Sequence, residues 1–320
     1  MPMIEMPMEE LKVYAGSSPK PADFEQYWQE SLRELDETGM DCEVKPAAFK
    51  AKGAVCSHLY FTGTGGARIH CKLLMPEKPG GPVPGIVLFH GYFGNAGSWS
   101  EKLHYVNSLG AAVLAMDVRG QGGTSQSVYA GVETLYGQVV QGVEDEDPKA
   151  LFYRHVYLDA VKAARLLMQM DGVDAGRIGV CGPSQGGALA VACAALEPRV
   201  KRTVPIYPFL SDFVRVRDLA GYITGYRQFD QHFRYRDPLH QREDAFFQRL
   251  GYIDIQNLAP RVKADVLWLL GLMDDVCPPS TQFAAFNKII SHKEMLIYPD
   301  FGHEPLYKSA DKVYNYFMEL

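Results

Sequence analysis

The pattern of residues around Ser184 is typical of a serine that acts as the nucleophile in acyl transfer. Ser184 lies at the centre of Gly182-Pro-Ser-Gln-Gly186, a G-x-S-x-G pattern with an apolar run at 177–181 before it and small residues at 187–196 after it. A serine at a sharp turn from strand to helix lies in strained backbone, with its hydroxyl exposed above the sheet edge. Because the flanking runs are typical of a buried strand and a helix, the pattern predicts a nucleophile elbow.

An acid and a histidine follow this serine in the chain, each directly after an apolar run that is typical of a strand. Asp274 follows the apolar run at 264–270, and His303 follows the run at 294–298. The order Ser, Asp, His, each just past the C-terminal end of a strand, is the order of the α/β-hydrolase fold. A lone loop histidine is more often structural than catalytic, but this position favours the catalytic role. Asp275 is an alternative acid one residue further along.

Two backbone amides are candidates for an oxyanion hole. The amide of Gln185 lies at the start of the expected helix, where unpaired N–H groups stabilise negative charge. In this fold the second amide comes from the loop after the third strand of the hydrolase sheet, and Tyr92 is the candidate. The spacing of Gly91, Gly94 and Gly97 departs from the G-x-G-x-x-G dinucleotide fingerprint, which disfavours a nucleotide cofactor.

The elements that must position these residues alternate between strands and helices. The N-terminal part predicts a helix over 21–36 and antiparallel strands over 43–75, with a hairpin turn at 63–66. The alternation that follows predicts a mostly parallel, doubly wound sheet with its active site at the carboxyl ends of the strands. The expected strands are 84–89, 111–116, 177–181, 203–207, 264–270 and 294–298, and the expected helices lie near 99–108, near 151–170 and over 187–196.

Two segments interrupt the alternation within what we expect to be one domain, 1–320. Residues 120–150 are glycine-rich and acidic, which predicts loop or short helix. Residues 208–250 are long, aromatic and rich in arginine. An insertion of this size before the acid-bearing strand predicts a lid, a wall of the site or an oligomer contact.

Composition and charge disfavour several classes of partner. The formal charge of −6 and the pI near 5.9 disfavour nucleic acid and anionic membrane, because both attract a basic face. The sequence contains no run of about 18 apolar residues, and its acidic, proline-containing start is unlike a signal peptide. Its six cysteines form no C-x-x-C pair and no zinc-ligand spacing. We therefore expect a cytoplasmic protein with reduced thiols and neither a metal nor an organic cofactor.

Taken together, the motifs resemble carbohydrate esterase family 7, the acetyl xylan esterases and cephalosporin C deacetylases. A serine followed by glutamine in the elbow, together with an Arg-Gly-Gln motif, is far more specific than the elbow alone. One departure from the family is Pro305-Leu-Tyr, where relatives carry small residues. The segments that carry the resemblance are Arg119-Gly-Gln121, the elbow, His303-Glu304, Pro208 to Phe213, Phe233 to Pro238, Leu250 to Ala259 and Gly271 to Thr281.

The resemblance implies a deacetylase acting on acetylated xylooligosaccharides and cephalosporins through an acyl-enzyme on Ser184. It also implies a homohexamer, a trimer of dimers, which a monomeric mass by light scattering would rule out. We interpret Arg119, Gln121 and Glu304 as structural support for the catalytic residues. Competing interpretations are a broad carboxylesterase, a thioesterase, an acyl-peptide hydrolase or a non-catalytic scaffold. By position, the expected walls of a small acyl pocket are Phe213, Val276 and Cys277.

Overall fold

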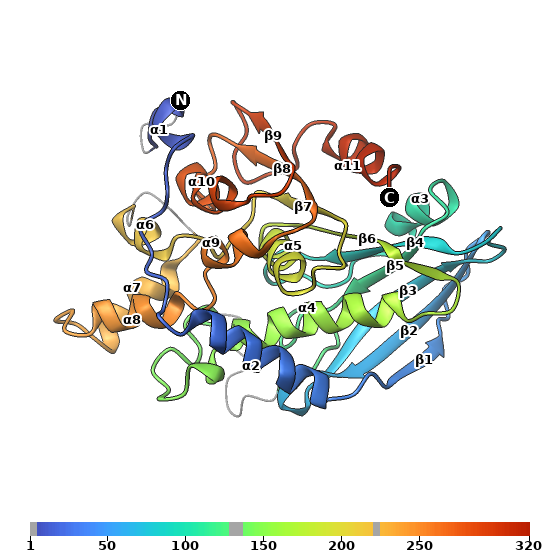
Figure 1. Ribbon diagram of the computed structural model, residues 1–320, viewed down its shortest axis with the longest axis horizontal. Helices are drawn as coiled ribbons and strands as arrows, with labels where there is room; N and C mark the ends of the chain where they lie inside the picture. Colours follow the sequence, from blue (N-terminus) through green and yellow to red (C-terminus); the bar gives the residue numbers. More distant parts are fainter. Residues whose placement is uncertain (1–4, 128–136, 220–224) are drawn as a thin grey trace.

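A nine-stranded mixed sheet lies at the centre of the computed structural model, which describes residues 5–127, 137–219 and 225–320 (Figure 1). The strands are β1 (Cys42–Pro46), β2 (Ala54–Thr62), β3 (Arg68–Pro76), β4 (Val83–Phe89), β5 (Ala112–Met116), β6 (Val173–Pro183), β7 (Arg202–Ile206), β8 (Asp265–Gly271) and β9 (Lys293–Tyr298). Their order is β1-β2-β3-β5-β4-β6-β7-β8-β9. Strands β4 to β9 run parallel, whereas β1, β2, β3 and β5 pair antiparallel in that order. The predicted α/β-hydrolase fold with an antiparallel extension is confirmed.

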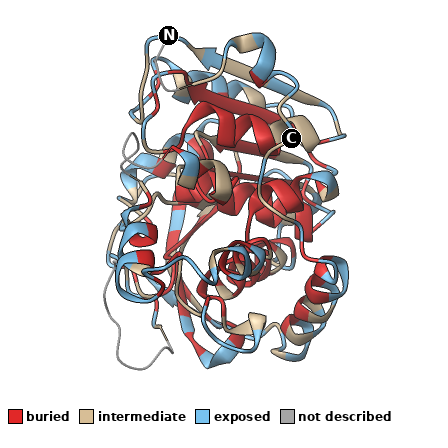
Figure 2. Cartoon of the chain, turned by 90° about the vertical axis from the view of Figure 1, so that its left-hand side faces the viewer, coloured by how far each residue is buried: buried red, intermediate tan, exposed pale blue. Residues whose placement is uncertain are grey.

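Helices cover both faces of the sheet and create two hydrophobic cores. The larger core includes Leu114 of β5 and the inner sides of α2, α4, α5 and α10, whereas the smaller includes Val113, α3 and α11. Neighbouring strand residues point to opposite faces, so the two cores lie on opposite sides of the sheet. Buried residues concentrate in the sheet and in the helices that pack on it (Figure 2). The helices are α1 (Met8–Leu11), α2 (Phe24–Glu37), α3 (Leu103–Asn107), α4 (Phe152–Met168), α5 (Gln185–Leu196), α6 (Phe213–Asp218), α7 (Arg227–Tyr235), α8 (Glu243–Leu250), α9 (Ile255–Leu258), α10 (Pro279–Lys288) and α11 (Ser309–Phe317).

The centre of the sheet and the helix that follows the elbow are fully buried. Every residue of β5 and of α5 is buried, as expected for elements covered on both sides. Helix α5 is built almost wholly from small residues, which lets it approach the sheet closely. Within the described ranges, no helix is both long and apolar enough to span a membrane.

The two segments that interrupt the alternation fold as follows. Between Gly137 and α4 the chain forms turns and a short 3₁₀ helix at Pro148–Ala150, in agreement with the expected loop. The 208–250 insertion contains α6, α7 and α8, which lie together at one end of the molecule (Figure 1). Parts of these segments, 128–136 and 220–224, lie outside the described residues.

Candidate active site

Ser184 occupies the turn between β6 and α5 in a strained conformation. Its φ is +55° and its ψ is −118°, a region that side-chain-bearing residues rarely adopt. Glycine is required two residues to either side: a Cβ on Gly182 or Gly186 would come within 2.4 or 2.3 Å of the Phe89 carbonyl oxygen. The Ser184 amide donates to the carbonyl of Ile206 at 2.8 Å. Neighbouring strands β4 and β7 therefore hold the elbow in place.

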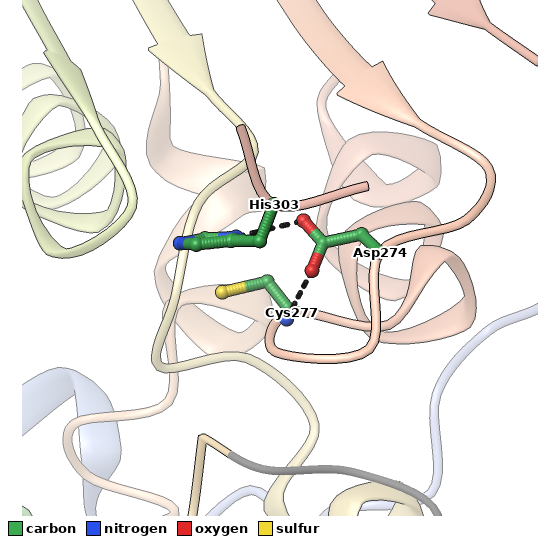
Figure 3. Close-up of side chains that lie close together, drawn as sticks. All are labelled: Asp274, Cys277 and His303. Carbon is green, nitrogen blue, oxygen red and sulfur yellow. Dashed lines mark hydrogen bonds and ion pairs between the residues drawn. The ribbon is translucent and has the colours of Figure 1, made fainter. Parts of the chain in front are cut away.

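A continuous chain of hydrogen bonds runs from this serine to a buried acid. Ser184 Oγ lies 3.0 Å from His303 Nε2, and His303 Nδ1 lies 2.9 Å from Asp274 Oδ2. The other carboxylate oxygen of Asp274 accepts the amides of Val276 and Cys277 at 2.9 and 2.7 Å (Figure 3). Because the carboxylate accepts a hydrogen bond from Nδ1–H, the ring proton stays on Nδ1 and the neutral imidazole presents Nε2 as an acceptor to the serine hydroxyl. This arrangement suits proton transfer from Ser184 during attack on a carbonyl carbon.

The alternative acid, Asp275, points elsewhere. Asp274 has 1% of its surface exposed, whereas Asp275 is exposed to solvent. In the described structure, the carboxylate that bonds His303 is that of Asp274. The geometry therefore favours Asp274 as the orienting acid.

A cavity of about 560 Å³ opens over the serine and the histidine. The ring of Tyr207 packs edge-on against the imidazole of His303, with 4.7 Å between ring centroids. Aromatic walls and a few polar groups are typical of small-molecule sites. The lining residues are Gly91, Tyr92, Phe93, Gly137, Pro183, Ser184, Tyr207, Phe209, Gly225, Arg227, Gln228, Gln231, Val276, His303, Glu304 and Pro305.

Of the three predicted wall residues, Val276 lines the cavity and Phe213 does not. Phe213 is fully buried at the start of α6, where it packs against Tyr226 and Phe229 with ring centroids 6.1 and 5.9 Å away. The aromatic wall residue of this segment is instead Phe209. The prediction for Phe213 was wrong because α6 directs its side chain into the larger hydrophobic core.

The third predicted wall residue, Cys277, lies behind the catalytic groups. The residue is 1% exposed, and its backbone amide donates to Asp274 Oδ1 at 2.7 Å. Burial, together with the Asp274 carboxylate, raises the pKa of the Cys277 thiol well above its ordinary value. Asp274, Cys277 and His303 converge within 4.8 Å (Figure 3), but a metal would need a thiolate and would compete with the bond between Asp274 and His303. The cluster fits a catalytic triad better than a metal centre.

The side chain of Gln185 is locked by a network of amides. Gln185 and Gln121 exchange two hydrogen bonds, of 2.7 and 3.0 Å. Tyr153 donates its hydroxyl to Gln185 Oε1 at 2.7 Å, and Gln121 donates to Gln138 at 2.8 Å. All four residues are buried, so the network fixes the first residue of α5 against the loop after β5. Because Gln185 carries one of the two proposed oxyanion amides, Gln121 supports the position of that amide.

The other two residues predicted as support make different contacts. Arg119 forms a fully buried, two-pronged ion pair with Asp159 of α4, at 2.6 and 2.7 Å, and donates to the Thr64 carbonyl at 3.1 Å. It therefore ties the loop after β5 to α4 and to the β2–β3 hairpin. Glu304 is exposed at the cavity, and its carboxylate accepts the Gly302 amide at 3.1 Å, beside His303.

The sequence reasoning missed His90, which positions the loop carrying Tyr92. The Val118 amide donates to His90 Nε2 at 2.9 Å, so the ring proton is on Nδ1, which donates to the Gly91 carbonyl at 2.7 Å. Burial lowers the pKa of His90 and so favours this neutral form. His90 could have been singled out from the sequence because it directly follows the expected strand 84–89 and precedes Gly91 and Tyr92.

The sequence reasoning also missed Asp117, a buried carboxylate that joins three segments. It accepts hydrogen bonds from His70 of β3 at 2.6 Å, from the Ala96 amide at 2.6 Å and from the Thr124 amide at 3.0 Å. Burial alone would raise its pKa, but these hydrogen bonds outweigh burial and lower the pKa to about 2. The available signal was its position directly after the expected strand 111–116.

Replacing Asp117 with asparagine should lower the free energy of unfolding by about 2 kcal/mol at pH 7. The pKa is about 2 in the folded chain against an ordinary 3.8, so the carboxylate stabilises the fold above pH 4 and loses this effect as the pH falls towards 2. About half of the deficit should have disappeared by pH 3. Urea unfolding at pH 7 and pH 3 measures it, with exposed Asp300→Asn as the control. An equal deficit at both pH values would contradict the assignment.

Comparisons with known proteins agree with this geometry. A family model described as acetyl xylan esterase (AXE1) matches residues 1–320. The structure is similar to acetyl xylan esterase 1 from Thermoanaerobacterium sp. JW/SL YS485, with 47% identity and a TM-score of 0.95 over 98% of this chain and 99% of that one. It is also similar to the acetyl xylan esterase from Paenibacillus sp. R4, with 33% identity and a TM-score of 0.91 over the same shares of the two chains.

A curated relative matches over a shorter region. Acetyl esterase Axe7A of Xylanibacter ruminicola is 34% identical over 163 residues, which are 51% of this chain and 35% of that protein. The chain thus spans about a third of the length of this relative. The whole-chain match to the family model and the likeness to two structures over nearly their full length carry the assignment. The chain belongs to the acetyl xylan esterase (AXE1) family, and with it to the carboxylic ester hydrolases.

Proposed function

We propose that this protein is a serine esterase that removes acetyl groups from acetylated xylooligosaccharides and from related small acetyl esters such as cephalosporin C. The observation that supports this most is the hydrogen-bonded chain Ser184–His303–Asp274 at the catalytic cavity. Family membership supports acetyl as the acyl group that is transferred to Ser184. We further propose that the protein is a homohexamer, as the resemblance implies, and that it is cytoplasmic, as its cysteine usage suggests.

The proposed reaction passes through an acyl-enzyme. Ser184 Oγ attacks the acetyl carbonyl carbon while its proton passes to His303 Nε2. The resulting oxyanion accepts hydrogen bonds from the amides of Tyr92 and Gln185; losing one such donor typically costs about 3–4 kcal/mol of barrier. His303 then delivers the proton to the sugar alkoxide, which leaves with its bonding electrons. Water, deprotonated by His303, attacks the acetyl-serine and releases acetate and the free hydroxyl of Ser184.

The shape of the cavity supports a short acyl group. Val276 and Phe209 lie among its lining residues, and Cys277, next to Val276 in the chain, is buried. A longer acyl chain would have to displace packed side chains, which is costly in a dense interior. Acetyl esters should therefore react faster than butyryl esters.

Acetate release from acetylated xylooligosaccharides, measured beside acetyl and butyryl nitrophenyl esters, tests this proposal. We expect acetate release and at least about a tenfold higher kcat/KM for the acetyl ester, because each misfit methylene costs roughly 1–3 kcal/mol. The Ser184→Ala protein serves as the blank. Hydrolysis of nitrophenyl esters with little preference for chain length would instead indicate a broad carboxylesterase, and faster reaction with thioesters would indicate a thioesterase.

A further inference from the structure

A second cavity, of about 510 Å³, adjoins the catalytic cavity along helix α7. The two cavities share Gly137, Gln228 and Gln231 as lining residues, so they meet at these residues. We name the second cavity the α7 groove. Helix α7 and the segment that precedes α4 lie at the same end of the molecule (Figure 1). The groove is lined by Gly137, Val140, Gly142, Val143, Glu144, Asp145, Gln228, Gln231, His232, Tyr235 and Arg236.

One face of α7 forms a wall of the groove. Gln228, Gln231 and Tyr235 are spaced three and four residues apart, which places them on the same side of a helix. Phe229 and Phe233 are buried and hold the helix against α8 and the core. From Gln228 to Tyr235 the helix rises on the order of 10 Å. The groove therefore extends away from Ser184 along a firmly packed helix and is long enough for a short stretch of oligosaccharide.

The side-chain amides of Gln228 and Gln231 differ in whether they already hydrogen-bond within the protein. Gln228 accepts the Val139 amide at 3.1 Å and hydrogen-bonds the hydroxyl of Tyr92. It therefore fixes the junction between the two cavities. Gln231 is exposed, and among the described residues none hydrogen-bonds its amide. A carboxamide can donate and accept at the same time, which matches the hydroxyl groups of a sugar.

The rest of the groove suits a neutral, polyhydroxylated ligand. Tyr235 is 73% exposed, and an aromatic ring offers a flat apolar surface beside a polar hydroxyl. Glu144 and Asp145 add carboxylate acceptors, while Arg236 adds a cation. Glu144 is already paired with Arg242 at 3.3 Å. Because both signs of charge are present and one pair is neutralised, the groove is not built for a strongly charged polymer.

We propose that the α7 groove is a sugar-binding subsite that holds the xylosyl residues flanking the acetylated one. Tyr235 supplies the ring against which a pyranose packs, and Gln231 hydrogen-bonds its hydroxyls at the junction with the catalytic cavity. The subsite would use binding energy from unreacted sugars to place the acetyl ester beside Ser184. This inference rests on the proposed function, because it names how that same site recognises its leaving group.

Two measurements on Tyr235→Ala test the subsite. The first is the ratio of kcat/KM for acetylated xylotetraose to kcat/KM for an acetylated methyl xyloside, which we expect to fall about tenfold. The second is calorimetric binding of unacetylated xylotetraose, which we expect the variant to lose. Tyr235→Phe keeps the ring and should retain most of both effects. Leu239→Ala, which removes a side chain that is 75% exposed in the same insertion but outside the groove, is the matched control.

The outcomes separate this inference from the proposed function. Acetate release from xylotetraose with an unchanged ratio and unchanged binding in Tyr235→Ala would overturn the subsite and leave the deacetylase intact. Hydrolysis of nitrophenyl acetate without acetate release from any acetylated sugar would overturn the proposed substrate. In that case loss of xylotetraose binding in Tyr235→Ala would still support the groove as a sugar site, and absence of binding to the unaltered protein would refute it.

Discussion

Replacing Ser184 with alanine should lower kcat by roughly 10⁵- to 10⁶-fold, for nitrophenyl acetate and for acetylated sugars alike. Without the hydroxyl, His303 Nε2 has no proton to take and no acyl-enzyme forms. The residual rate over water would come from substrate binding and the oxyanion amides. Steady-state assays with extensively purified protein measure the loss, and the acetyl adduct expected on Ser184 can be sought by mass spectrometry after rapid quenching.

The fold of the Ser184→Ala protein should be unchanged. Alanine occupies the same strained backbone as serine, and the hydrogen bond from residue 184 to the Ile206 carbonyl comes from the main chain. Thermal unfolding beside the unaltered protein checks this. Activity above about one hundredth of the starting value in a folded variant would show that another nucleophile acts.

Local signals in the sequence predicted the elements near the elbow well. The strand and helix around Ser184, the hairpin turn near Gly65 and the strands before Asp274 and His303 all lie within a few residues of their predicted places. Each depends on a short pattern: an apolar run, a glycine cluster or a small-residue helix. These patterns also predicted which residues follow the strand ends, so Ser184 and His303 could be named in advance, whereas the choice of Asp274 over Asp275 came chiefly from the family resemblance.

The order of the strands and the partners of buried polar groups could not be predicted in the same way. Strand β5 lies between β3 and β4, a pairing between segments distant in the chain that no local pattern encodes. The network around Gln185 likewise joins Gln121, Gln138 and Tyr153 from separate segments. A sequence shows that these residues are polar, but burial and mutual distance depend on the whole packed structure.

The direction of individual side chains was the weakest part of the prediction. Phe213 and Phe209 lie in one aromatic segment, and sequence position alone could not decide which faces the substrate. The left-handed backbone at Leu210 and Asp212, with φ of +61° and +49°, turns the chain between them. This turn directs Phe213 into the core and leaves Phe209 at the cavity. Backbone states of this kind are rare outside glycine and carry little sequence signal.

Replacing Asp274 with asparagine should lower kcat about 10⁴-fold while leaving the fold intact. One carboxylate oxygen of Asp274 accepts the amides of Val276 and Cys277, so the asparagine oxygen will take that place. Its NH₂ group will then face His303 Nδ1, where the carboxylate oxygen now lies 2.9 Å away. The imidazole must accept this hydrogen, which moves its own proton to Nε2 and leaves no acceptor for the hydroxyl of Ser184.

Asp275→Asn provides a matched control for this prediction, because it makes the same chemical change one residue further along, at an exposed carboxylate. We expect it to keep kcat for nitrophenyl acetate within roughly twofold of the unaltered protein, because the carboxylate bonded to His303 is that of Asp274, and an exposed substitution also changes stability little. Both variants should unfold at similar urea concentrations, so the contrast reports catalysis and not folding. Full activity in Asp274→Asn with loss in Asp275→Asn would mean that the acid bonded to His303 here is not the one that orients it in turnover.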